Sequence, residues 1–132
     1  MIKLFESFTD LEDTKFLLML KAIDTDNPDI VDFFVKKGYD IDDVEIFLKA
    51  TRNSDSLRYL LKNGIDPNNY KNINDDRGLK DYETQKALMD YNYGRYIEKY
   101  IGFNWKIKED PKYAELVHKI INKAKNAGKF NL

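Results

Sequence analysis

The chain has 132 residues, enough for one domain with a hydrophobic core. Its hydrophobic content of 42% and aromatic content of 14% argue against wholesale disorder, and the absence of cysteine excludes disulfides, cysteine-ligated zinc and thiol catalysis. The net charge of −1 hides a gradient: residues 1–76 carry 16 acidic and 10 basic residues, whereas residues 104–132 carry 7 lysines and 3 acidic residues.

The N-terminal residues show no targeting signal. The stretch MIKLFESFTD contains one lysine and lacks the apolar run of a signal peptide. The longest apolar run, residues 16–20, is too short to cross a membrane. We therefore expect a soluble cytoplasmic protein that does not bind a membrane.

The first half of the chain contains an internal repeat. Residues 30–42 align with residues 56–68 at a constant offset of 26, with matching apolar positions and identical Lys, Gly and Asp residues. Upstream, Leu-Lys-Ala at 20–22 recurs at 48–50 with an offset of 28, which predicts a two-residue difference in the turn between the helices of each copy.

Each copy predicts two helices that are joined by a polar turn and followed by a glycine. In the first copy, Asn27 is a suitable N-cap and Pro28 suits the first helical position. Gly38 and Gly64 stand where a helix ends in the left-handed conformation, which glycine adopts without steric cost. We expect the residues after each glycine to be extended, because Pro67 cannot continue a helix.

The stretch YLLKNGIDPN, residues 59–68, resembles the end of the second helix and the following turn of an ankyrin repeat, and FVKKGYDID, residues 34–42, is a weaker copy. The Thr-Pro-Leu-His signature of the family's first helix is missing. The spacing of 26 to 28 is shorter than the family's period of about 33 residues. The resemblance implies an all-α fold, a short ankyrin-like stack of antiparallel helix pairs in which the β-hairpin fingers are truncated.

Beyond residue 69 the repeat becomes irregular. In chain order we expect a polar loop over residues 68–81, a third helix pair over 82–91 and 93–101, an extended segment over 103–107, and a helix that begins at Pro111 and ends at Gly128. That last helix is Lys-rich and would cap the stack, since terminal repeats need a polar outer face. Residues 2–8 would pack over the other end.

These expectations define one domain over residues 1–132. Within it, residues 9–69 form two ankyrin-like units, residues 70–103 a degenerate third unit, and residues 104–132 a C-terminal capping segment. Three units are near the minimum for a stable array, which leaves self-association through an open end as an alternative to a monomer.

No catalytic or metal-binding pattern is found. The acidic turns at residues 24–29 and 40–45 fail the calcium-loop pattern, because hydrophobic residues or proline occupy required ligand positions. His118 is the only histidine and has no partner with metal-ligand spacing. The serines lack a nucleophile-elbow setting, and no phosphate loop occurs. We expect a non-enzymatic protein without a cofactor or metal.

The favoured function is protein binding. Ankyrin-like proteins bind partners through their connecting tips and the concave face of their inner helices. The resemblance therefore implies a surface built from acidic residues, neighbouring loop residues and part of a tyrosine cluster. Tyr93, Tyr96 and Tyr100 share one helical face, which is either core or an exposed aromatic stripe. The predicted partner-binding residues are Asp40, Asp42, Asp43, Asn69, Tyr70, Asp75, Asp76, Arg77, Tyr93 and Tyr96.

The partner's identity is open, although the Lys-, Asn- and Tyr-rich composition resembles that of small phage accessory proteins, which suggests inhibition of a host enzyme. The alternative is a nucleic-acid-associated accessory protein. It would use Lys119, Lys123 and Lys125 of the C-terminal helix, with Trp105 and Tyr113 to stack on bases. The acidic first half of the chain makes nucleic acid the less favoured partner.

Overall fold

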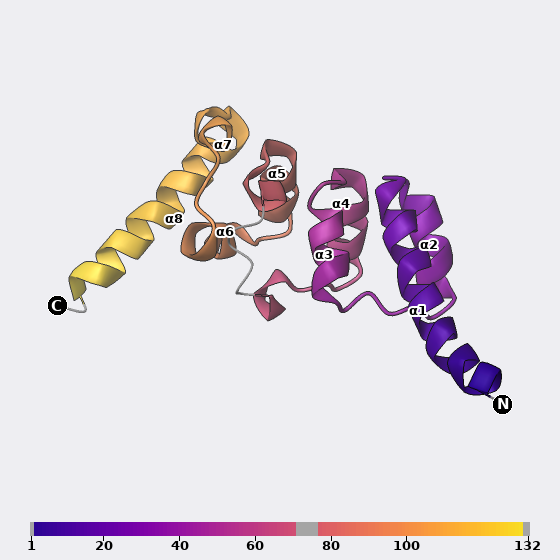
Figure 1. Ribbon diagram of the computed structural model, residues 1–132. Coiled ribbons are helices and arrows are strands. Elements are labelled where there is room, and N and C mark those ends of the chain that lie inside the picture. The colour runs from indigo at the N-terminus through magenta and orange to yellow at the C-terminus, as the bar shows by residue number, and fades with distance from the viewer. Residues whose placement is uncertain (1, 71–76, 131–132) are drawn as a thin grey trace. The chain divides into compact units, whose positions relative to one another are not determined.

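The chain is all-helical throughout the part that the structure describes. The computed structural model describes the backbone of residues 2–70 and 77–130, and the side chains of residues 12–70 and 77–126. These residues form eight α-helices and two short 3-10 helices and no strand (Figure 1), which confirms the all-α prediction. The chain divides into two compact units, an N-terminal unit of residues Met1–Ile65 and a C-terminal unit of residues Asp66–Leu132. The single domain stays a prediction.

The N-terminal unit consists of two helix pairs. Helices α1 (Ile2–Asp24) and α2 (Pro28–Lys36) form the first pair, and α3 (Val44–Ala50) and α4 (Ser54–Lys62) form the second. Helix α1 packs against α2 and α3, and α4 packs against α2 and α3, so the two pairs lie side by side (Figure 1). Residues 2–8, expected to be a separate covering segment, are the first part of α1, and their side chains lie outside the described residues.

The core of this unit follows from helical spacing of apolar side chains. Met19, Ala22 and Ile23 are buried on α1, at positions that face the same side of a helix. The residues that α2, α3 and α4 bury against them are Val31, Ile46, Phe47, Ala50, Leu57, Leu60 and Leu61. The acidic and basic residues between these positions remain on the outer faces.

The turns inside the two pairs are equivalent at an offset of 26. The hydroxyl of Thr25 donates to the backbone carbonyl of Ala22, and the hydroxyl of Thr51 donates to that of Leu48, both at 2.6 Å. The helix that follows begins three residues later in each case. The predicted two-residue difference in this turn is therefore wrong, because the spacing of 26 already holds where the first helix of each pair ends.

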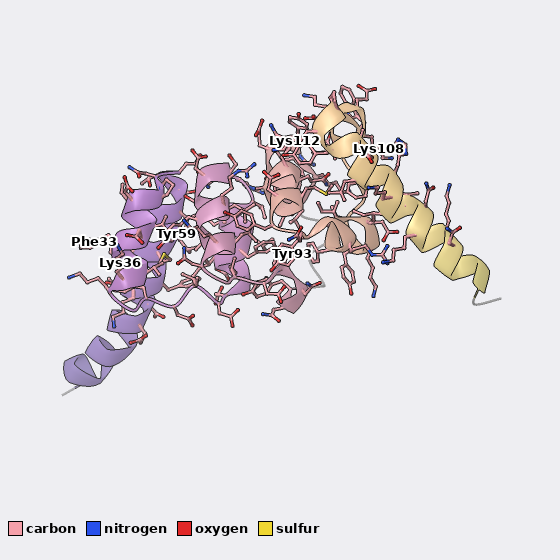
Figure 2. All side chains as sticks on the ribbon, turned by 180° about the vertical axis from the view of Figure 1, so that it is seen from behind. Phe33, Lys36, Tyr59, Tyr93, Lys108 and Lys112 are labelled. Carbon is pink, nitrogen blue, oxygen red and sulfur yellow. The ribbon has the colours of Figure 1, made fainter. Side chains whose placement is uncertain are left out.

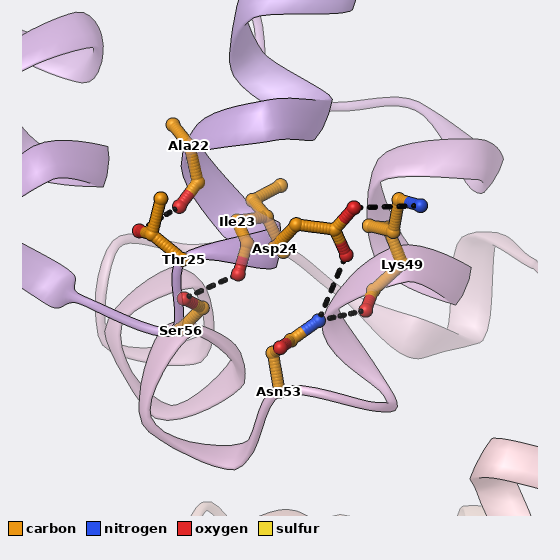
Figure 3. A network of polar contacts seen from close by, with 7 residues as sticks. All are labelled: Ala22, Ile23, Asp24, Thr25, Lys49, Asn53 and Ser56. Carbon is orange, nitrogen blue, oxygen red and sulfur yellow. Dashed lines mark hydrogen bonds and ion pairs between the residues drawn. The ribbon is translucent and has the colours of Figure 1, made fainter.

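Polar contacts join the two pairs where these turns meet (Figure 3). The carboxylate of Asp24 on α1 forms an ion pair with Lys49 of α3 at 3.0 Å and accepts a hydrogen bond from the Asn53 side chain at 3.5 Å. The buried hydroxyl of Ser56 donates to the backbone carbonyl of Ile23 at 3.2 Å. The Ser56 contact satisfies a hydroxyl that burial would otherwise leave unpaired, whereas the contacts of Asp24 are solvent-exposed.

The second helix of each pair ends in the same left-handed glycine. Gly38 has a φ of +88° and Gly64 a φ of +97°. The glycine N–H donates to the carbonyl three residues earlier, at 3.0 Å for Gly38 and 3.2 Å for Gly64. The N–H of the next residue, Tyr39 or Ile65, donates to the carbonyl five residues earlier at 3.1 Å. Both helices therefore end in a Schellman motif.

The C-terminal unit contains 3-10 helices η1 (Pro67–Asn69) and η2 (Arg77–Lys80) and helices α5 (Tyr82–Asp90), α6 (Gly94–Tyr100), α7 (Trp105–Glu109) and α8 (Pro111–Phe130). Helices α5 and α6 match the expected third pair and contact each other, while α8 packs on α6 and α7. Residues 65–68 were expected to be extended, but the 3-10 helix η1 begins within them, at Pro67.

Two expectations for this unit are wrong. The segment 103–107 is not extended, because Asn104 caps α7 by accepting a hydrogen bond from the Lys106 N–H at 2.9 Å. Gly128 does not end the last helix, which continues to Phe130. Glycine inside a helix costs about 1 kcal/mol relative to alanine, and a long helix can accommodate that cost.

A buried glutamine organises the core of the C-terminal unit. The Gln85 side chain of α5 is fully buried. Its amide nitrogen donates to the carbonyls of Leu79 at 2.9 Å and Gly102 at 3.0 Å, and its amide oxygen accepts from the Asn104 N–H at 2.7 Å. One side chain therefore fixes the segment before α5 and the segment between α6 and α7.

Candidate functional site

A pocket of about 260 Å³ lies in the N-terminal unit, where α1 meets the connection between α2 and α3. Helix α1 contributes Glu12, Lys15 and Phe16, which are spaced to share one helical face. The connection contributes Gly38, Tyr39 and Asp40, and the start of α3 contributes Asp43 and Ile46.

The glycine turn positions the aromatic wall of this pocket. Gly38 reverses the chain at the end of α2, and Tyr39 follows it with its ring 5.0 Å from the ring of Phe34. The ammonium group of Lys15 stands 5.7 Å from the centre of the Tyr39 ring, within cation–π distance. The Tyr39 ring is half-buried and so presents part of its surface to the pocket.

Two of the three carboxylates of the pocket are fixed by backbone groups. Asp40 accepts a hydrogen bond from the Asp42 N–H at 2.9 Å, and Asp43 caps α3 by accepting from the Glu45 N–H at 2.8 Å. A carboxylate offers about four acceptor sites, so each retains acceptor capacity. Glu12 lies 3.9 Å from the ammonium of Lys15, one turn along α1.

The pocket is therefore acidic. Three carboxylates and one ammonium line it, which gives a formal charge of −2. Because the charges converge on a concave surface, their field acts on a bound group more strongly than isolated surface charges would. This arrangement can bind a cation.

The predicted partner-binding residues fall in different parts of the chain. Asp40 and Asp43 line the pocket, and Asp42 is exposed on the same connection. In the C-terminal unit, Asn69 and Arg77 are exposed and Tyr70 is half-buried. The predicted residues Asp75 and Asp76 lie outside the described residues.

Of the three tyrosines of the predicted stripe, Tyr96 belongs to the core, whereas Tyr93 (labelled in Figure 2) and Tyr100 are half-buried. Tyr96 is 3% exposed and its hydroxyl donates to the carbonyl of Tyr70 at 3.2 Å, so Tyr96 is wrong as a predicted contact residue. Burial raises the pKa of Tyr96 to about 12. Tyr93 is half-buried; burial, followed by the charge of Asp66, raises the pKa of its hydroxyl.

The lysines of the alternative site do not form one stripe. At about 100° per residue, Lys119 and Lys123 lie about 40° apart around α8, whereas Lys125 lies about 120° to 160° from them. The ammonium of Lys119 forms an ion pair with Glu115 at 3.4 Å. Tyr113, proposed as a base-stacking residue, is 4% exposed and donates to Asp90 at 3.1 Å. Trp105 is 64% exposed on α7 and keeps an available ring.

Within the described ranges, no group of three His, Asp or Glu side chains is placed to hold a metal ion. His118 is exposed on α8. Among the helices of those same residues, none is both long enough and apolar enough to cross a membrane.

Sequence reasoning missed the other half of the pocket. Glu12, Lys15, Phe16, Tyr39 and Ile46 were not singled out, because they come from three segments of the chain. The available signal was the spacing of Glu12, Lys15 and Phe16, which brings an acid, a base and an aromatic ring to one face of a helix.

In comparisons with known proteins, no family profile, curated protein or solved structure matches this chain.

Proposed function

We propose that this protein is a non-enzymatic protein-binding module with an ankyrin-like architecture. Support for the architecture comes from the N-terminal unit, where two helix pairs share equivalent turns and equivalent left-handed glycines at a spacing of 26 residues. In such an array the connections after the glycines form the docking tips. The long helix α8 would serve as the C-terminal cap.

The observation that carries the proposal is the first of these connections. Residues 38–43 place two fixed carboxylates and an aromatic ring around a pocket. A pocket of this kind suits a side chain of a partner protein, since anchor side chains that fill pockets contribute much of the binding energy at interfaces. The protein would act by occupying its partner's surface, and an inhibited host enzyme is the proposed kind of partner.

The nucleic-acid alternative rests on α7. Trp105 is 64% exposed and the ammonium of Lys106 lies 5.7 Å from its ring centre, a combination that can stack on a base and contact phosphate. Two other residues that were predicted to serve nucleic-acid binding do not support it. Tyr113 is buried, and Lys125 lies on another face of α8 than Lys119 and Lys123.

Affinity capture with matched variants tests the proposal. The wild-type protein, the triple variant Asp40→Asn/Asp42→Asn/Asp43→Asn and the control Asp29→Asn/Asp55→Asn/Glu98→Gln are immobilised. Each is then incubated with a bacterial lysate, in parallel with and without nuclease treatment. Asparagine caps helices as well as aspartate does, so both triples remove three charges while preserving the turns. Captured proteins are identified by mass spectrometry and then purified for binding measurements.

The proposal predicts a protein that binds the wild type and the control directly and binds the tip variant at least about tenfold more weakly. Equal binding to all three, or no protein above background, would overturn it. Capture of nucleic acid instead, with affinity that falls steeply as salt rises from roughly 50 to 200 mM, would establish the alternative.

A further inference from the structure

We propose that the pocket formed by α1 and the α2–α3 connection binds the guanidinium group of an arginine side chain from the partner protein. This inference rests on the proposed function and specifies what the partner inserts. The sequence pattern of the acidic tip did not reveal it, because the tip residues become a site only where α1 closes them into a pocket.

The pocket already contains a cation at its aromatic wall. The ammonium of Lys15 lies 5.7 Å from the centre of the Tyr39 ring, and its ion pair with Glu12 is long, at 3.9 Å, and solvent-exposed. An exposed pair of this kind contributes little, so Lys15 can leave the ring without a large loss. A cation from outside can then take the position over Tyr39 that Lys15 marks.

The remaining walls suit the arginine stem. Phe16 is half-buried and Ile46 is 1% exposed, and both line the pocket beside the Tyr39 ring. Methylene groups of a long basic side chain bury readily along such apolar surface while the charged end reaches polar groups.

Arginine fits the carboxylates better than lysine does. Asp40 and Asp43 are held by backbone N–H groups at 2.9 and 2.8 Å, so they need little rearrangement to accept further hydrogen bonds. A guanidinium group is planar, carries five donors and stacks on aromatic rings, whereas an ammonium group is a compact and strongly hydrated charge. Stacking on Tyr39 and donation to two carboxylates require the planar group.

Size and charge disfavour the other common ligands. Pockets for drug-sized ligands and cofactors span about 300 to 1,000 Å³, and this pocket has about 260 Å³. Its formal charge of −2 repels phosphates and carboxylates. A single cationic side chain is the group that matches both properties.

The test is a titration of the ¹⁵N-labelled full chain with N-acetyl-arginine amide, followed by NMR. N-acetyl-lysine amide and N-acetyl-citrulline amide serve as comparisons, because citrulline has the shape of arginine without its charge. We expect shifts of the amide signals of residues 12–16 and 38–46, and a roughly millimolar dissociation constant for the arginine probe. Lysine should bind more weakly and citrulline at least about tenfold more weakly.

Variants separate the pocket from general electrostatic attraction. Asp40→Asn/Asp43→Asn should weaken arginine binding about tenfold, while the control Asp29→Asn/Asp55→Asn, which removes the same charge from exposed positions of the same unit outside the pocket lining, should leave it unchanged. Lys15→Met should strengthen binding about threefold by removing the resident cation, and Lys21→Met, also on α1, should not.

Three results would overturn the inference: equal affinity for arginine and citrulline, equal weakening by the pocket variant and its control, or shifts confined to other residues. Its failure is distinct from failure of the proposed function. Suppose that the captured partner does not bind the triple variant of the tip and that the arginine probe does not bind the wild type. The protein-binding function is then supported, and the assignment of the pocket to arginine is wrong.

Discussion

Gly38 and Gly64 offer a direct test of the equivalence between the two helix pairs. Both residues have a left-handed φ, +88° and +97°, and a Cβ added to either meets no atom within 4 Å. Substitution by alanine therefore adds no clash with neighbouring groups. Only the backbone cost remains, which makes the two positions comparable.

The magnitude follows from that backbone cost. The left-handed conformation costs a residue with a Cβ roughly 1–2 kcal/mol, and alanine recovers about 0.4–1 kcal/mol by restricting the unfolded chain. Gly38→Ala and Gly64→Ala should each lower the free energy of unfolding by about 1 kcal/mol, and by similar amounts. Asparagine tolerates this conformation better, so Gly38→Asn and Gly64→Asn should cost less than alanine.

Urea unfolding followed by far-ultraviolet circular dichroism measures these changes. Gly94 supplies the contrast, because a Cβ there would lie 2.6 Å from Ile120 Cδ1 and 2.9 Å from Met89 Sδ. Gly94→Asn should therefore cost more than Gly94→Ala, the reverse of the order at Gly38 and Gly64. A neutral Gly38→Ala, or asparagine more costly than alanine at Gly38 or Gly64, would refute the reasoning.

Three further predictions concern single side chains. Gln85→Leu should lower the free energy of unfolding by about 3 kcal/mol, because it leaves buried backbone partners of Gln85 unpaired; a loss below about 1 kcal/mol in urea unfolding would contradict this. Burial raises the pKa of both Tyr59 and Tyr96 from 10 to about 12, and for Tyr59 a hydrogen bond to Asp32 adds to the effect. The folded state thus holds these protons more tightly, so their contribution to stability is complete below pH 10 and is lost as pH rises towards 12. Ultraviolet titration should show that the phenols of Tyr59 and Tyr96 ionise late, and ionisation of all nine tyrosines near pH 10 would count against it. Trp105, the single tryptophan and 64% exposed, should emit like free tryptophan and be quenched by iodide, whereas blue-shifted, protected emission would show that α7 is covered.

The parts of the fold that sequence predicts well depend on local chemistry. Pro28 begins α2, and Gly38 and Gly64 follow the caps of α2 and α4, because proline fits a first helical position and glycine adopts a left-handed φ. The segment 103–107 was wrongly predicted to be extended, because five alternating residues are too few to distinguish a strand from one helical turn. The decisive signal there was the capping residue Asn104.

The pocket and the core polar contacts depend on distant parts of the chain. Gln85 interrupts the apolar pattern of α5, so sequence alone assigns it to solvent, yet its partners Leu79, Gly102 and Asn104 come from other segments. Tyr96 shows the same difficulty, since an aromatic stripe on a helix fits both a core and an interface, and only packing separates them.

Hydrogen exchange of the protein alone and with its captured partner tests the docking surface most directly. If the acidic tip of the N-terminal unit is the contact, the partner should slow exchange in residues 12–16 and 38–46. Protection confined to residues 105–126, with the tip exchanging as in the free protein, would place the contact on α7 and α8 and contradict the account.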